Sequence, residues 1–110
     1  MELSQQHCVP CEGGMSPMSE EGITKNLLLI STWSLKEGRL YKKFEFKTFP
    51  ESVAFVNAIM PIAEKEGHHP DIAIFYNIVE LTLWTHAIGG LSVNDFILAS
   101  KIDILYKSAS

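Results

Sequence analysis

Three of the four histidines of this 110-residue chain lie within 19 residues of one another. His68 and His69 are adjacent and are followed by Pro70, and His86 lies further along the chain. An imidazole titrates near pH ~6.5, so its ring can give or take a proton at neutral pH. Three such rings suit a proton-transfer reaction such as an elimination of water.

The elements around these histidines are expected to bring them together. A helix is predicted to end at Gly67, and alternating apolar residues predict a strand over 71–76. Asn77 marks a tight turn into a second strand that ends near His86. Antiparallel pairing centred on Asn77 places His86 opposite about His68. We therefore expect all three rings to share one edge of a sheet.

The same histidines also fit a metal site or a purely structural role. Three histidines are the ligand set of a catalytic zinc site, although adjacent histidines seldom aim at one metal. Histidines at a helix end can also simply interact with the negative end of the helix dipole. Trp33 and Trp84 could stack on a planar ligand, but a tryptophan in a core or an interface is the commoner case.

Two acidic residues are candidates for a supporting role. Asp95 stands three residues after Ser92, where a carboxylate supports a helix N-cap. Glu64 stands in the last turn of its helix, where a negative charge is mildly unfavourable. An acid in an unfavourable place hints that it orients a histidine.

Cys8 and Cys11 form a C-x-x-C pair close to the N-terminus. This spacing occurs in zinc sites and redox sites. Only His7 is nearby as a third ligand, and no strand precedes the pair as a redox motif requires. The sequence therefore favours an irregular arm over residues 1–15 that carries two thiols.

Periodicity predicts a single domain over residues 1–110 with an α+β fold. A short helix over about 20–28 precedes a hairpin with strands at 33–35 and 40–47. A second helix begins at the capping box of Thr48 and continues, kinked, through Pro61. It carries a broad apolar stripe of Val53, Val56, Met60 and Ala63, with Phe55, Ile59 and Ile62 beside them. The second hairpin and a helix from Ser92 to about Tyr106 follow. This gives a two-layer domain whose four-stranded antiparallel sheet has its helices packed on one face.

The last helix is apolar on more than one side, which predicts a contact between subunits and hence a homo-oligomer, either a dimer or a tetramer. A net charge of −4 argues against nucleic acid as a partner. No apolar run approaches the roughly 18 residues of a membrane span, so no membrane partner is expected. The first residues do not form a secretory signal, which indicates the cytoplasm.

The fixed gaps between these residues resemble a known family, the pterin-4a-carbinolamine dehydratases. Its pattern is matched at every gap, and the lead-in Cys-Val-Pro-Cys-Glu-Gly-Gly is similar to that of bacterial members. The likeness extends from about Cys8 to Ile104. The residues that match the pattern are Glu64, His68-His69-Pro70, Tyr76, His86 and Asp95.

The resemblance implies dehydration of 4a-hydroxytetrahydropterin to quinonoid dihydropterin and water, which recycles the pterin cofactor of aromatic amino-acid hydroxylases. It implies no metal and no organic cofactor, since the pterin is the substrate, and subunits that join through their strands and last helices. The alternative is a non-catalytic binding or accessory module that acts through its oligomerisation helices. The implied catalytic residues are His68, His69 and His86; the implied substrate-binding residues add Pro70, Thr85, Ala87 and Ile88, with Glu64 and Asp95 in support.

Overall fold

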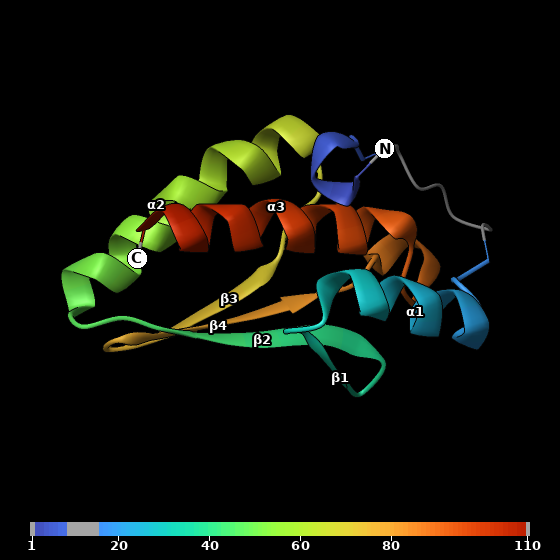
Figure 1. The fold of residues 1–110 in the computed structure, drawn as a ribbon, viewed down its shortest axis with the longest axis horizontal. Coiled ribbons are helices and arrows are strands. Elements are labelled where there is room, and N and C mark those ends of the chain that lie inside the picture. Colours follow the sequence, from blue (N-terminus) through green and yellow to red (C-terminus); the bar gives the residue numbers. More distant parts are fainter. Residues whose placement is uncertain (1, 9–15, 110) are drawn as a thin grey trace.

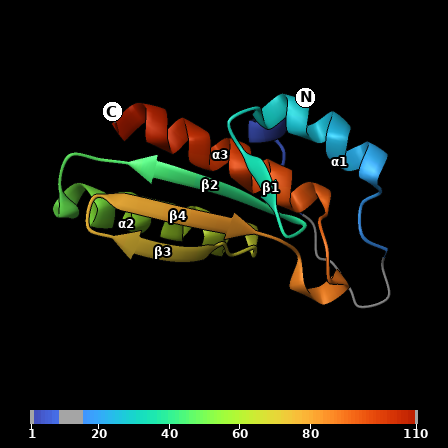
Figure 2. The same cartoon turned by 90° about the horizontal axis from the view of Figure 1, so that it is seen from below.

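A computed structural model describes residues 2–8 and 16–109 as a sheet covered on one face by helices. The strands are all antiparallel and lie in the order β1-β2-β4-β3. Figures 1 and 2 show α2 and α3 over the same face of this sheet, which confirms the predicted α+β fold. No described helix has the length and hydropathy to span a bilayer. The elements are α1 (Glu20–Leu27), β1 (Ser34–Lys36), β2 (Arg39–Glu45), α2 (Phe49–Glu66), β3 (Asp71–Phe75), β4 (Ile78–Leu83) and α3 (Val93–Ala109), with 3-10 turns η1 (Leu3–Gln5), η2 (Leu28–Ile30) and η3 (His86–Ile88).

The core lies between the sheet and the two long helices. Alternate residues of β2 and β4 point inward, and α3 contributes a continuous buried run from Asn94 to Ala99. Burying each large apolar side chain contributes about 1.5–3 kcal/mol. The fully buried apolar side chains include Leu40, Phe44, Val79, Leu81, Leu83, Phe96, Leu98 and Ile102.

Helix α2 ends directly before the paired histidines. Its N-terminus is capped by Thr48, whose hydroxyl accepts the Glu51 N–H. The helix continues through Pro61, as predicted, and stops at Gly67, which takes a left-handed φ of 65°. A residue with a Cβ would be strained at this φ, so glycine allows the chain to turn out of the helix into His68.

The broad apolar stripe predicted for α2 is confirmed except at Met60. Phe55, Ile59 and Ala63 face the core at successive intervals of four residues, whereas Met60 is 60% exposed. Val56 and Ile62 lie at the margin of this face and pack against the core while partly buried.

The register of the second hairpin differs by one residue from the prediction. Phe75 pairs with Ile78, so the turn consists of Tyr76 and Asn77, with Tyr76 at a φ of 55°. Strand β4 ends at Leu83, and His86 therefore lies in the η3 turn rather than at the end of a strand. An isolated bridge between Thr85 and Gly90 closes the loop that carries His86.

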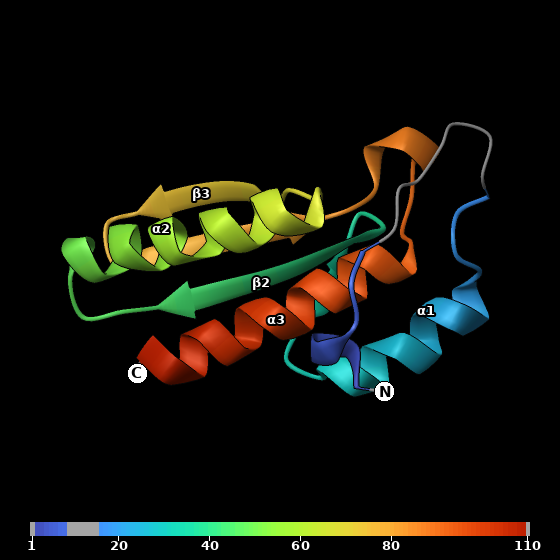
Figure 3. The same ribbon diagram turned by 90° about the horizontal axis from the view of Figure 1, so that it is seen from above.

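The N-terminal segment is not simply an irregular arm. Leu3 is buried in the η1 turn, and the Lys101 ammonium of α3 donates to the Ser4 carbonyl over 2.8 Å. Figure 3 shows η1 beside α3. The chain itself therefore covers part of the second apolar side of α3, whereas Val93 and Ile104 on the same helix remain 38% and 50% exposed. Residues 9–15, including Cys11, lie outside the described residues.

The carboxylate of Asp103 joins α3 to strand β2 and to the segment that precedes β1. Asp103 accepts the Trp33 indole N–H with both oxygens, at 3.0 and 3.1 Å, and pairs with the Lys42 ammonium at 2.8 Å. Lys42 occupies an inward-facing position of β2, and its side chain is 14% exposed. Because these groups are largely shielded from water, removing one of them should lower the free energy of unfolding.

We expect Asp103→Asn to lower the free energy of unfolding by about 2 kcal/mol, because the variant loses charge-assisted hydrogen bonds. Urea unfolding followed by circular dichroism measures this change. The matched control is Glu21→Gln, which removes an exposed pair with Lys25 and should change stability by less than about 0.5 kcal/mol. Equal effects of the two substitutions would contradict the anchoring role of Asp103.

Candidate active site

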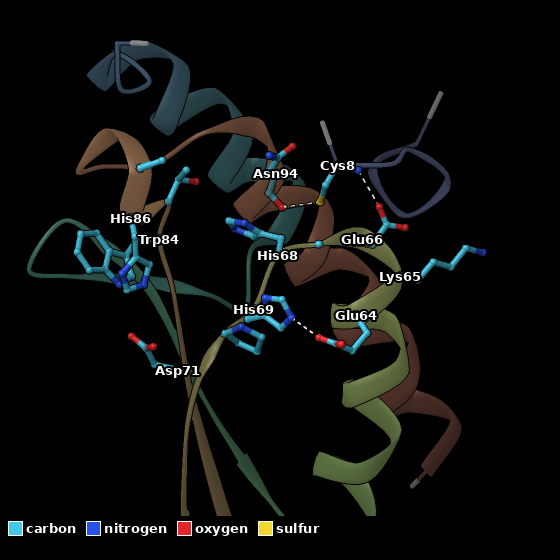
Figure 4. Close-up of a pocket in the computed structure, with 14 residues that line it drawn as sticks. Cys8, Glu64, Lys65, Glu66, His68, His69, Asp71, Trp84, His86 and Asn94 are labelled. Carbon is cyan, nitrogen blue, oxygen red and sulfur yellow. Dashed lines mark hydrogen bonds and ion pairs between the residues drawn. The ribbon is translucent and has the colours of Figure 1, made fainter. Parts of the chain in front are cut away.

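A pocket of about 560 Å³ opens where α2, β3 and the β4–η3 connection meet. Its size lies in the usual range for sites that bind small molecules. Figure 4 shows its lining residues, with His68 and His69 in the middle and His86 to one side next to Trp84. The sequence-predicted residues that line it are Glu64, His68, His69, Pro70, Thr85, His86 and Ala87.

The remaining two predicted site residues lie elsewhere. Ile88, the last residue of the η3 turn, is not among the residues that line the pocket. Its role in substrate binding stays a prediction. Asp95 does not line the pocket either, but its carboxylate lies behind His68 and contacts that ring directly.

His68 is held by Asp95 in the interior. The Nε2 atom of His68 lies 2.6 Å from Asp95 Oδ1, and the Asp95 side chain is fully buried. A carboxylate only accepts hydrogen bonds, so Nε2 carries the proton in this contact. Nδ1 of His68 is therefore the nitrogen that remains to exchange a proton with a bound molecule. The negative charge of Asp95 can also offset the positive charge that a proton on Nδ1 creates.

The Asp95 carboxylate is itself fixed at the start of α3. Its Oδ2 atom accepts the Ser92 backbone N–H at 2.9 Å and the Thr85 hydroxyl at 2.8 Å. The bond from Ser92 is one half of a capping box, as the sequence predicted. Thr85 in turn bonds to the Ser92 hydroxyl, so β4 and α3 are joined below the pocket.

His69 has a different carboxylate partner and a different environment. Its Nε2 atom lies 2.5 Å from Glu64 Oε2, and the two side chains are 58% and 70% exposed. Glu64 does contact a histidine, as its position at the end of the helix suggested. Water screens a pair this exposed, so the contact restrains the ring only weakly.

The N-terminal segment returns to the pocket, which the sequence did not predict. Glu66 accepts the Cys8 backbone N–H at 2.7 Å and the His7 Nδ1–H at 2.8 Å, and its side chain is only 3% exposed. Cys8 thereby becomes part of the pocket wall. The available signal was a second acidic residue in the last turn of α2, where a negative charge needs a partner. Lys101, 3.8 Å away, supplies a further positive charge.

The contact between Glu66 and Cys8 shifts the pKa values of both side chains. Burial raises the pKa of Glu66, but hydrogen bonds from Cys8 and His7 and the charge of Lys101 outweigh it and hold that pKa below its usual range. Burial, together with the negative charges of Glu66 and Asp95, raises the pKa of the Cys8 thiol to about 12. Cys8 is therefore a neutral thiol at physiological pH, and its Sγ lies 3.6 Å from the Asn94 carbonyl.

The pocket does not assemble a metal-ligand set from the described residues. Within residues 2–8 and 16–109, no three side chains of His, Cys, Asp or Glu converge closely enough to hold an ion. The three-histidine zinc site considered from the sequence therefore has no counterpart in this geometry.

Comparison with known proteins gives one consistent result. Residues 16–105 match the family described as "Pterin 4 alpha carbinolamine dehydratase". A Nitrosospira multiformis protein named "Putative pterin-4-alpha-carbinolamine dehydratase" is 45% identical over 106 residues, which cover 96% of this chain and 94% of that protein.

Two solved structures are also similar. One is a transcriptional coactivator/pterin dehydratase from Brucella melitensis, with a TM-score of 0.77 and 29% identity over 82% of this chain and 98% of that one. The other is a pterin dehydratase-like protein identified as a RuBisCO assembly factor in the alpha-carboxysome, with a TM-score of 0.55 and 27% identity over 67% and 86% of the two chains.

The contact at Glu66 makes a prediction about thiol reactivity. At pH 8 the thiolate fraction of Cys8 should be roughly a thousand times smaller than that of a free cysteine with a pKa near ~8.5. In a Cys11→Ser background, iodoacetamide should therefore alkylate Cys8 at least roughly tenfold more slowly than it alkylates glutathione. Glu66→Ala should raise the rate, because the N-terminal segment loses its acceptor.

The matched control is Glu64→Ala, which removes a neighbouring carboxylate that does not contact Cys8. Mass spectrometry of timed samples measures the rates. A wild-type rate equal to that of glutathione, or equal rates in the two alanine variants, would contradict the role given to Glu66.

Proposed function

Because the chain belongs to the pterin-4a-carbinolamine dehydratase family, we propose that it removes water from a 4a-hydroxytetrahydropterin to give quinonoid dihydropterin. We also propose that this reaction regenerates the pterin cofactor used by aromatic amino-acid hydroxylases. The observation that carries the proposal is the buried Asp95–His68 pair at a pocket that His69 and His86 also line.

The proposed reaction requires two coupled proton movements. The C4a–O bond breaks and the hydroxyl leaves with an added proton as water. The N5–H bond gives its electron pair to a new C4a=N5 double bond, and its proton goes to a base. The reaction therefore needs one group that donates a proton and one that accepts a proton, and no net proton is consumed.

The histidines supply both kinds of group. His68 exchanges protons at Nδ1, because Asp95 occupies Nε2. His69 likewise has Nδ1 available, since Glu64 occupies its Nε2. His86 lines the same pocket from the η3 turn, so a flat bicyclic substrate bound there would have more than one imidazole near its reacting bond. A placed acid or base of this type contributes roughly 10²–10⁴-fold to a rate.

A second role is favoured by one comparison. The alpha-carboxysome relative is described as an assembly factor, so an accessory role through protein contacts is the alternative function for this chain. The two roles make different demands on the pocket, because an accessory module has no need for a buried carboxylate that orients an imidazole.

The proposal predicts which substitutions abolish dehydration. In stopped-flow assays with chemically made 4a-hydroxytetrahydropterin, His68→Ala and His86→Ala should each lower kcat/KM by roughly a hundredfold or more. Asp95→Asn should lower it by roughly 10- to 100-fold, because His68 loses the group that fixes its orientation.

The matched control is Asp103→Asn, which neutralises another shielded aspartate of α3 far from the pocket wall. It should cost stability and leave the rate unchanged. If His68→Ala and His86→Ala both retain the wild-type rate, the catalytic proposal is wrong and the accessory role gains support.

We further propose that the protein is a homo-oligomer in which β3 pairs with a second copy. Strand β3 is at one end of the sheet order and pairs only with β4 within the described chain. It also exposes apolar side chains: Ile72 is 40% and Phe75 is 59% exposed. An open apolar edge strand of this kind is a ready template for pairing with another chain.

This proposal predicts a charge-sensitive assembly. Sedimentation should give a dimer or larger species at micromolar concentration, and Ala73→Lys should shift it towards the monomer, because a lysine at a strand edge disfavours pairing. Ser34→Lys, at the opposite edge on β1, is the control and should leave the assembly intact. A wild-type monomer at micromolar concentration would refute the proposal.

A further inference from the structure

His86 differs from the other two pocket histidines in what holds its ring. His68 and His69 each bond to a carboxylate through Nε2. Among the described residues, the side chain of His86 has no hydrogen-bond or ion-pair partner. Its ring instead lies against the indole of Trp84, with centroids 4.0 Å apart and planes inclined by 39°.

The other face of the same indole is occupied by Arg39. The guanidinium carbon of Arg39 lies over the Trp84 ring, 3.9 Å from its centroid. Two groups centred within about 4 Å of one ring centre cannot share the same face, because their atoms would overlap. Arg39, Trp84 and His86 therefore form a three-layer stack with the indole in the middle.

The sheet fixes the base of this stack. Leu40 pairs with Leu83, so the preceding residue Arg39 and the following residue Trp84 stand side by side on the face of the sheet away from α2 and α3. Arg39 is the first residue of β2, and Trp84 directly follows β4. The indole is thus set on two paired strands, whereas His86 is on a short 3-10 turn.

Hydrogen bonding does not hold the indole in this position. The Trp84 Nε1 atom is buried and has no hydrogen-bond partner in the described residues. A buried unpaired N–H is unfavourable, so a different contact must keep the ring where it is. Stacking on both faces accounts for the position of the ring, and a planar cation such as guanidinium suits that contact especially well.

We propose that Trp84 is a positioning residue for His86 and that Arg39, stacked on its far face, fixes the indole in place. In this arrangement the stack fixes the orientation of the His86 ring, as the Asp95 carboxylate fixes the orientation of the His68 ring. The consequence for catalysis rests on the proposed dehydratase function, but the stacking itself does not.

The stacking can be tested without any enzyme assay. A ring that lies 4.0 Å above an indole has its proton resonances moved upfield by the ring current, so the His86 imidazole signals should be displaced from those of a free histidine. His86→Gln identifies these signals among the four histidines. Trp84→Leu should return them to ordinary positions, and Trp84→Phe should keep a smaller displacement.

The matched control is Tyr41→Leu. Tyr41 is an aromatic residue of β2 that also carries a stacked cation, the Lys36 ammonium at 4.7 Å, but it does not contact His86. This variant should leave the His86 signals unchanged. Undisplaced His86 signals in the wild-type protein, or displaced signals that persist in Trp84→Leu, would overturn the stacking whatever the protein catalyses.

The kinetic part of the proposal has a separate readout. Trp84→Leu should lower kcat for dehydration by roughly tenfold or more while Trp84→Phe retains most of it, because the phenyl ring restores a stacking surface. Arg39→Met should have a smaller effect in the same direction. If Trp84→Leu releases the His86 ring but keeps the wild-type kcat, the positioning role is wrong.

The two proposals fail in distinguishable ways. A wild-type protein without dehydratase activity refutes the proposed function, while the resonance measurements still decide whether His86 is stacked. If Trp84→Leu does not fold, judged by circular dichroism, Trp84→Phe and Arg39→Met decide the question: unchanged His86 signals in both would overturn the proposal.

Discussion

The buried carboxylate of Asp95 is the interaction on which the geometry of the pocket depends. Its two oxygens bind groups from three parts of the fold: the Ser92 N–H at the start of α3, the Thr85 hydroxyl after β4, and the His68 ring after α2. A fully buried charge is tolerated only when it is well paired. The same contacts that satisfy Asp95 therefore hold the two layers of the domain in register around His68.

Much of this could be predicted because the relevant signals are local. The cap at Thr48, the stop at Gly67 and the Ser92–Asp95 box each depend on residues three or four positions apart, and each has the predicted role. Strand alternation likewise gave the buried face of β2 and β4. These signals were enough to place the histidines near one another, although the hairpin register was off by one residue.

The features of the fold and pocket that the sequence did not predict depend on contacts between distant parts of the chain. Nothing local to His7 and Cys8 indicates that Glu66, nearly 60 residues away, accepts hydrogen bonds from both. The same is true of η1, whose packing against α3 covers part of the apolar side that was expected to be exposed. Trp84 was recognised as able to stack, but its partners come from another strand and from a turn that periodicity does not reveal.

The pocket therefore combines one firmly held imidazole with two that are held more loosely. His68 is fixed by a hydrogen bond to the fully buried Asp95 carboxylate, whereas the pair of His69 is exposed and the ring of His86 is restrained by an aromatic surface. In the proposed dehydration, the proton acceptor must stay aligned with one nitrogen of a rigid ring system, while the water that forms must leave. The fixed ring of His68 on the interior side suits a proton acceptor that must stay aligned. The more exposed rings of His69 and His86 on the open side are compatible with the departure of water. This division follows from burial, since the same type of side chain is used at all three positions.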